Sequence, residues 1–151
     1  MNYYAPHFSE AELVFSQTAV RTGIDNAIPE RLEPNLIRLS WWLETLREIL
    51  GKPIIVSSGY RSPELNARIG GSKSSAHMQG LAADINVSGM APFDLANLIV
   101  SEMGDTGYDQ VIHEFGRWVH VGLSDSVMRL EALTAMTENG KTIYKHGIIE
   151  V

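Results

Sequence analysis

The chain has 151 residues, no cysteine, and 18 acidic against 12 basic side chains, which gives a formal net charge of −6. The lack of cysteine excludes disulfides, thiol catalysis and cysteine–zinc sites, and the acidic balance argues against nucleic acid or an anionic lipid surface as a partner. No apolar run is long enough to span a membrane, and the first residues lack the basic and apolar segments of a signal peptide. We expect one domain over residues 1–151, made in the cytoplasm and not inserted into a membrane.

Start and stop signals predict four helices, over residues 9–20, 29–50, 62–69 and 91–103. Ser9 opens an S-x-x-E capping box, and Ser62 stands before a proline at the first position of a helix. The helix over residues 29–50 carries leucines at i+3 and i+4 spacing and ends before Gly51, where a terminating glycine belongs. Trp41 and Trp42 widen its apolar stripe, so both are expected in the core.

Short runs rich in β-branched residues predict the strands. A buried strand is expected over 52–57 and a second over 81–87, and a tight turn joins a pair over 111–114 and 118–123. Asn139-Gly140 is a strong hairpin signal. It predicts a C-terminal hairpin, within residues 127–151, whose strands lie near 129–136 and 141–144. Together these elements predict an α+β fold in which helices pack on a mainly antiparallel sheet.

Two polar residues lie in the middle of predicted strands. Side chains alternate across a strand, so Asp84 and His120 each point away from the face on which their apolar neighbours lie. The small Gly122 leaves room beside the imidazole of His120. Burying an unpaired carboxylate is costly, so Asp84 needs a partner, and a turn at Gly80 can fold His77 back towards it.

Two histidines and one aspartate form a candidate metal site. His77, Asp84 and His120 give zinc three ligands and leave a fourth position open for water, as in catalytic zinc sites. The same donors also suit manganese, iron or nickel. Glu114 precedes His120 by six residues across a tight turn, so it lies beside the same site, where a carboxylate can take a proton from water. From the residues alone, a structural role for a histidine or aspartate on a strand is the more common alternative.

Three motifs resemble a known family. Residues 75–84 fit S-x-H-x-x-G-x-A-x-D, residues 118–120 fit W-x-H, and residues 58–62 read S-G-Y-R-S. Over about residues 8–124, this order and spacing resembles the M15 zinc peptidases that cut bacterial cell-wall peptides. The family includes D-Ala-D-Ala carboxypeptidases, D-alanyl-D-alanine dipeptidases and phage endolysins that act as L-alanyl-D-glutamate peptidases. The resemblance implies the zinc fold that these peptidases share with the hedgehog signalling domain.

The resemblance also implies roles for individual residues. One zinc ion is expected on three ligands, which are His77, Asp84 and His120. Arg61 matches the arginine that holds substrate and stabilises the oxyanion, for which its fixed fork of donors is suited. Ser75 matches a serine that contacts substrate, and Trp118 is expected to line the cleft as a further substrate-binding residue.

The catalytic carboxylate departs from the usual family pattern. Many M15 enzymes place it three residues before the last histidine, but Arg117 occupies that position here and cannot act as a base at neutral pH. Glu114 is the nearby carboxylate upstream, and the hedgehog domain also has a glutamate six residues before its last zinc histidine. We therefore assign the base to Glu114.

The sequence thus predicts a zinc metallopeptidase that hydrolyses a bond in the stem or cross-link peptides of bacterial peptidoglycan, with Glu114 activating the zinc-bound water. It would be of the D-Ala-D-Ala carboxypeptidase or L-Ala-D-Glu endopeptidase type. We expect a monomer that acts at the bacterial cell wall after release, or as part of a phage. The alternative is a non-catalytic zinc-binding module of the same fold that binds cell-wall or protein ligands.

Overall fold

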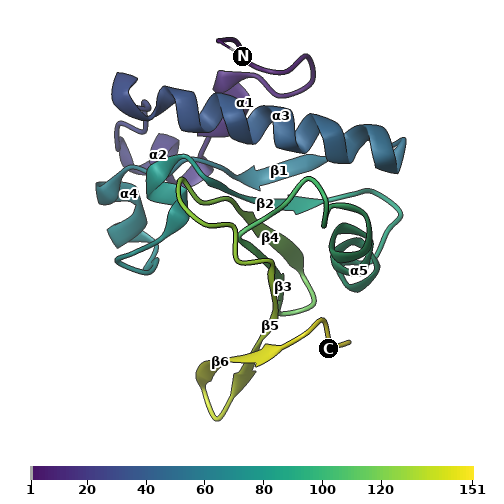
Figure 1. The fold of residues 1–151 in the computed structure, drawn as a ribbon. Helices are drawn as coiled ribbons and strands as arrows, with labels where there is room; N and C mark the ends of the chain where they lie inside the picture. Colours follow the sequence, from purple (N-terminus) through teal and green to yellow (C-terminus); the bar gives the residue numbers. More distant parts are fainter. Residues whose placement is uncertain (1) are drawn as a thin grey trace.

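A six-stranded sheet is the centre of the computed structural model, which describes residues 2–151 (Figure 1). The strands lie in the order β1-β2-β4-β3-β5-β6. They are β1 (Ile55–Ser58), β2 (Ala82–Asn86), β3 (Gln110–Glu114), β4 (Trp118–Gly122), β5 (Glu131–Glu138) and β6 (Lys141–His146). β3 and β5 are parallel, and the other neighbouring pairs are antiparallel. The predicted α+β class with a mainly antiparallel sheet is confirmed.

Helices pack against this sheet, with α3 above β1 and β2 in Figure 1 and α5 against β3 and β4. They are α1 (Glu10–Val14), α2 (Gln17–Thr22), η1 (Glu30–Leu32), α3 (Glu33–Leu50), α4 (Pro63–Arg68), η2 (Ala76–Gln79) and α5 (Pro92–Glu102), where η marks a 3-10 helix. The predicted helix over residues 29–50 is divided between η1 and α3. No helix within residues 2–151 has the length and apolar character needed to cross a membrane.

The core lies between α3, α5 and one face of β2 and β4. The leucines that predict α3 are buried, and they form one cluster with alternate residues of the two strands, namely Ala83, Ile85, Val119 and Val121. The predicted alternation is therefore confirmed, and it leaves Asp84 and His120 on the opposite face. Gly51 ends α3 with φ 66°, as its position predicts.

The two tryptophans of α3 have different environments. Trp42 is 6% exposed, and its indole N–H donates to the carbonyl of Gly107 at 2.7 Å. Trp41 is half-buried, with its ring against Tyr3 and its N–H donating to the Tyr3 carbonyl. The prediction that both lie in the core is wrong for Trp41, because consecutive residues of a helix are separated by about 100° around its axis.

Two short helices replace the single helix that Ser9 predicts. The Ser9 cap is present, but Phe15 is extended, with ψ 133°, and ends α1. The hydroxyl of Ser16 then accepts the Ala19 N–H at 3.1 Å and starts α2. The prediction of a continuous helix to Val20 is wrong because the serine hydroxyl bonds to the backbone as a new N-cap.

β1 is an edge strand, whereas the sequence predicts a buried strand over residues 52–57. It pairs with β2 and lies at the end of the strand order. Ile55 is 54% exposed, and the buried isoleucine of this segment is Ile54, which precedes β1. A short apolar run is typical of central and edge strands alike, because the position in the sheet depends on distant partners.

The C-terminal hairpin forms where the sequence predicts it. Asn139 and Gly140 have φ 53° and 77°, as the two central residues of a type I′ turn require. β5 and β6 pair on either side of them, and β6 continues to His146 instead of ending at Tyr144. The parallel pairing of β5 with β3 attaches this hairpin to the rest of the sheet.

The segment after β1 passes very close to α1. The N–H of Tyr60 donates to the carbonyl of Leu13 at 2.8 Å. A Cβ on Gly59 would overlap that carbonyl oxygen, so a glycine is needed at this position. The contact fixes the segment that carries Arg61 against the N-terminal helix.

We predict that Gly59→Ala destabilises the fold, because the Leu13 carbonyl can move only if α1 shifts. Overpacking of this kind costs about 1–3 kcal/mol, and each kcal/mol lowers Tm by roughly 2–4 °C in a chain of this size. Gly104→Ala is the matched control, since the nearest atom to its Cβ would lie 4.0 Å away. Calorimetry should show a lower Tm for Gly59→Ala alone, and equal Tm values for the two variants would contradict the close approach.

Candidate metal centre and its cleft

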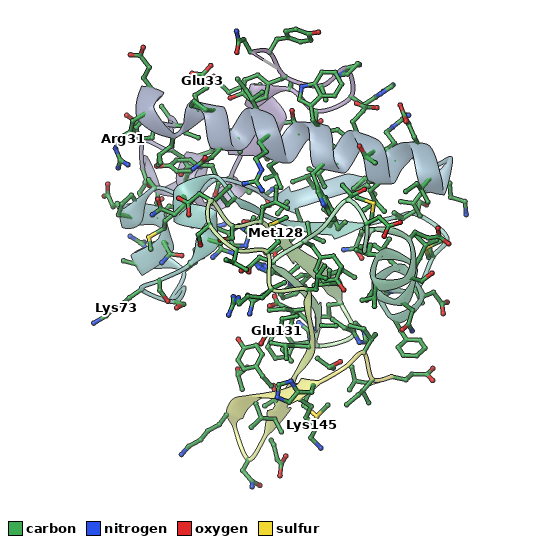
Figure 2. The ribbon with its side chains drawn as sticks, viewed as in Figure 1. Arg31, Glu33, Lys73, Met128, Glu131 and Lys145 are labelled. Atoms are coloured by element: carbon green, nitrogen blue, oxygen red, sulfur yellow. The ribbon has the colours of Figure 1, made fainter. Side chains whose placement is uncertain are left out.

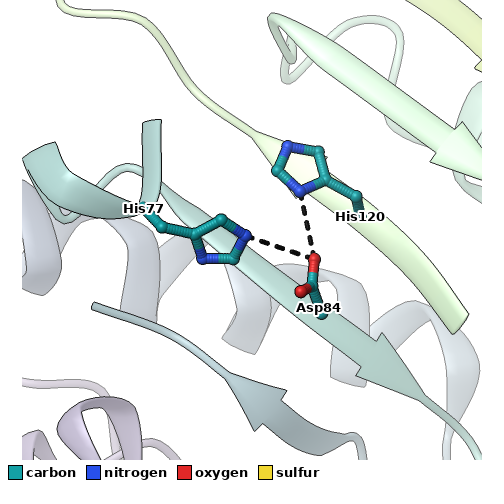
Figure 3. A group of neighbouring side chains, drawn as sticks. All are labelled: His77, Asp84 and His120. Atoms are coloured by element: carbon teal, nitrogen blue, oxygen red, sulfur yellow. Dashed lines mark hydrogen bonds and ion pairs between the residues drawn. The ribbon is translucent and has the colours of Figure 1, made fainter. Parts of the chain in front are cut away.

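Three elements bring two histidines and an aspartate together (Figure 3). His77 lies in η2, Asp84 in the middle of β2, and His120 directly opposite Asp84 on β4. The hydroxyl of Ser75 caps η2 by accepting the His77 N–H at 3.2 Å. Gly80 ends the same turn with φ 72°. This turn folds His77 back towards Asp84, as the sequence predicts.

The facing atoms have a spacing that suits a metal ion. Asp84 Oδ1 lies 3.3 Å from His77 Nε2 and 3.0 Å from His120 Nδ1. One possible ligand atom from each residue lies within 4.8 Å of the other two. Ligands at about 2.1 Å from a tetrahedral zinc ion are about 3.4 Å from one another. The three side chains can therefore hold a metal ion after small adjustments.

The ring of His77 is fixed from behind. Its Nδ1 lies 2.7 Å from the carbonyl oxygen of Gly59. A carbonyl only accepts, so Nδ1 carries the hydrogen and Nε2 presents a lone pair to Asp84. Burial lowers the pKa of His77 and favours the neutral ring, which is the form that binds metals. A cation bound by Nε2 and the carboxylate would satisfy the lone pairs of both groups.

Asp84 is the anion at the centre of this cluster. Its side chain is buried, and burial alone would raise its pKa. The hydrogen bond with His120 opposes burial, and the pKa of Asp84 lies well below its ordinary value. The second carboxylate oxygen lies 3.4 Å from Nη2 of Arg61. The carboxylate therefore stays ionised and suits a cation.

Arg61 is held in one orientation by three acceptors. Its Nε donates to the Ser58 hydroxyl at 3.2 Å, its Nη1 to the Asn66 amide oxygen at 3.2 Å, and its Nη2 to Asp84 at 3.4 Å. Burial lowers the pKa of Arg61, while the carboxylates of Asp84 and Glu114 oppose this shift. A guanidinium stays charged at neutral pH in proteins. The site therefore has a fixed positive charge next to the cluster of His77, Asp84 and His120.

An open cleft of about 740 Å³ lies over the cluster, within the size range of ligand sites. His77, His120, Arg61 and Glu114 all line it. The loop over residues 70–76, which carries the labelled Lys73 in Figure 2, contributes one part of the wall. The hairpin β5–β6, where Glu131 and Lys145 are labelled, contributes another through residues of both strands.

Glu114 lies in this cleft at the end of β3. Its Oε1 accepts the indole N–H of Trp118, its partner on β4, at 2.6 Å. Burial raises the pKa of Glu114, the charge of Asp84 adds to this, and His120, Trp118 and Arg61 oppose it. A carboxylate whose pKa is raised exchanges protons closer to neutral pH, as a general base requires.

The other predicted substrate contacts differ in position. Ser75 lines the cleft beside His77. Trp118 lines a neighbouring hollow with Phe115 and Met136, and its link to the cleft is the hydrogen bond to Glu114. Direct contact between Trp118 and a substrate therefore stays a prediction.

Asn66 is a site residue that no motif in the sequence indicates. Its amide oxygen accepts from Arg61, and its Nδ2 donates to the Ser72 carbonyl at 2.9 Å. A Cβ on Gly71 would overlap that amide oxygen, so the glycine lets the cleft loop close over Asn66. The glycine pair at residues 70–71 is a visible signal of a tight loop, but its partner becomes apparent only in the fold.

We predict that Asp84→Ala lowers zinc affinity by more than about 100-fold, because it removes the anionic member of the cluster. Equilibrium dialysis with metal analysis measures this, and circular dichroism confirms that the variant is folded. His146→Ala is the control, since His146 is exposed and lies outside the cluster. Parent-like zinc affinity in Asp84→Ala would contradict the assignment.

Comparisons with known proteins agree with this geometry. The family model described as Peptidase M15 matches residues 6–122, which include His77, Asp84 and His120. The chain is also 42% identical over 52 residues to the zinc D-Ala-D-Ala carboxypeptidase of Streptomyces albus G. That match covers 34% of this chain and only 20% of the relative. Because the family match extends over most of the sequence, the chain belongs to the M15 family of peptidases.

Proposed function

We propose that the chain is a zinc-dependent peptidase that hydrolyses a bond in the stem or cross-link peptides of bacterial peptidoglycan. The observation that carries the proposal is the cluster of His77, Asp84 and His120 at an open cleft that also contains Glu114. The family membership supports a peptidase. The name of the relative supports zinc and a D-Ala-D-Ala substrate, and L-Ala-D-Glu is the other candidate bond.

In this proposal the ligands are His77 Nε2, one oxygen of Asp84 and a ring nitrogen of His120. Zinc bound there would supply Lewis-acid chemistry, lowering the pKa of water and polarising a carbonyl. The protein keeps the His77 ring in place through the Gly59 carbonyl, which accepts from Nδ1, the nitrogen that does not face Asp84. Such contacts orient metal ligands in many proteins.

Glu114 is the proposed general base. Its carboxylate accepts a proton from water and later gives that proton to the leaving amine. The indole of Trp118 fixes one carboxylate oxygen, which leaves the other available for proton transfer. The raised pKa of Glu114 favours both steps, because a very weak base would not take the proton.

Arg61 is the proposed electrophilic partner. Its guanidinium is charged and held by Ser58, Asn66 and Asp84, so little reorganisation is needed during the reaction. A fixed cation of this kind stabilises negative charge that develops on the oxygen of the attacked carbonyl. Ser75, on the same wall, is proposed to contact the substrate peptide. The proposed place of action is the bacterial cell wall, reached after release or as part of a phage.

Digestion of purified peptidoglycan tests the function. Zinc-loaded protein is expected to release peptide fragments, chelator to abolish release, and added zinc to restore it. Mass spectrometry of the new termini then names the bond that is cut. If folded, zinc-loaded protein releases no fragments, the proposal fails and a non-catalytic zinc-binding module becomes the better account.

We predict that Glu114→Gln reduces turnover by about 100-fold or more, the contribution expected of a general base. Zinc content should stay at the parent level, because Glu114 is not one of the three proposed zinc ligands. Kinetics on peptidoglycan fragments and metal analysis of the same sample provide the two readings. Near-normal turnover in this variant would remove Glu114 from its proposed role.

The pH profile of kcat/KM gives a further prediction. Activity requires ionised Glu114, so it is lost as pH falls through a pKa that burial has raised above the ordinary glutamate value. Trp118→Phe removes a donor that stabilises the carboxylate, and His120, Asp84 and Arg61 remain as the facing charges. The acid limb should therefore move to higher pH, measured with zinc in excess. An acid limb at the same pH in the parent and in Trp118→Phe would contradict the assignment of this pKa to Glu114.

A further inference from the structure

The C-terminal hairpin lies outside the family match but takes part in the cleft. The match ends at residue 122, and β5 and β6 cover residues 131–146. Leu133, Thr142 and Tyr144 nevertheless line the same cleft as His77, His120 and Glu114. This part of the wall is therefore a feature of this chain beyond the region that the family model describes.

Strand register aligns Tyr144 with the proposed base. Glu114 is paired with Ala135 on β5, and Ala135 is paired with Tyr144 on β6. Residues paired across neighbouring strands point to the same face. Ala135 has a short side chain, so no large side chain on β5 separates Glu114 from Tyr144. Burial raises the pKa of Tyr144, and the charge of Glu114 adds to this shift, which is consistent with their proximity.

Side-chain contacts fix the hairpin to the rest of the sheet. Arg129 makes a bidentate ion pair with Asp109, at 2.9 and 2.8 Å, just before β5. On the opposite face, the ring of His113 bonds to the Ile149 carbonyl at 2.8 Å. The hydroxyl of Thr134 donates to the Gly147 carbonyl, also at 2.8 Å. The first two contacts hold the two ends of the hairpin against β3 and the residue before it, and the third ties the residue after β6 to β5. The cleft wall therefore has a defined position.

Tyr144 is unusual among the residues of this wall. It is a large aromatic side chain that is 58% exposed although it lines a cleft. An aromatic ring with a hydroxyl combines an apolar surface with a hydrogen-bond donor, which suits contact with a peptide. We propose that the hairpin β5–β6 is part of the substrate site and that Tyr144 is a substrate-binding residue that contacts the peptide beside Glu114. This inference rests on the proposed peptidase function.

Steady-state kinetics of full-length Tyr144→Ala on soluble peptidoglycan stem peptides tests the inference. KM should rise about tenfold, with kcat within about twofold of the parent, because uniform binding is lost and the chemistry is retained. Tyr144→Phe keeps the ring and loses one hydrogen bond, so its KM should rise about threefold. Zinc content and Tm should match the parent in both variants.

Lys145→Ala is the matched control, since Lys145 is exposed, adjacent in β6 and directed to the other face of the sheet. Its KM should equal that of the parent. If the parent is active and Tyr144→Ala has the same KM, the hairpin proposal is wrong and the peptidase function stands. A parent that releases no product disproves the function instead. Calorimetric binding of the same stem peptides then decides the hairpin proposal, which survives only if the parent binds and Tyr144→Ala binds more weakly.

Discussion

The ionised carboxylate of Asp84 is the group on which the rest of the site depends. A buried anion is stable in a fold only when opposite charges or donors surround it. Arg61 and His120 come from two separate segments and approach the carboxylate oxygens at 3.4 and 3.0 Å. The contacts that compensate this charge therefore also join β2 to β4 and to the segment after β1.

The two faces of the sheet have different roles. One face of β2 and β4 packs on α3 and α5, and the other carries Asp84 and His120. Continuation of the ladder through β3 adds Glu114 to the same face. Asp84, His120 and Glu114 lie on paired strands and His77 lies on a capped turn, so backbone hydrogen bonds set the distances between them. Such elements hold a site more precisely than loops do.

Local signals in the sequence predict much of this arrangement. Alternation along the strands predicts the shared face of Asp84 and His120, and the motif resemblance favours metal binding over a structural role. Local patterns do not predict contacts between segments that are far apart in the sequence. The sequence does not show that Ile55 lies on an edge strand, that Asn66 holds Arg61, or that parallel pairing of β5 with β3 brings the hairpin to the cleft.

The location of zinc in crystals of the zinc-loaded protein would show whether His77, Asp84 and His120 bind the metal. Anomalous difference density at the zinc absorption edge would be measured and compared with the positions of the three side chains. We expect one strong peak, with ligand atoms of His77, Asp84 and His120 at about 2.0–2.2 Å from it. Zinc density at another place, or none at this cluster, would contradict this expectation.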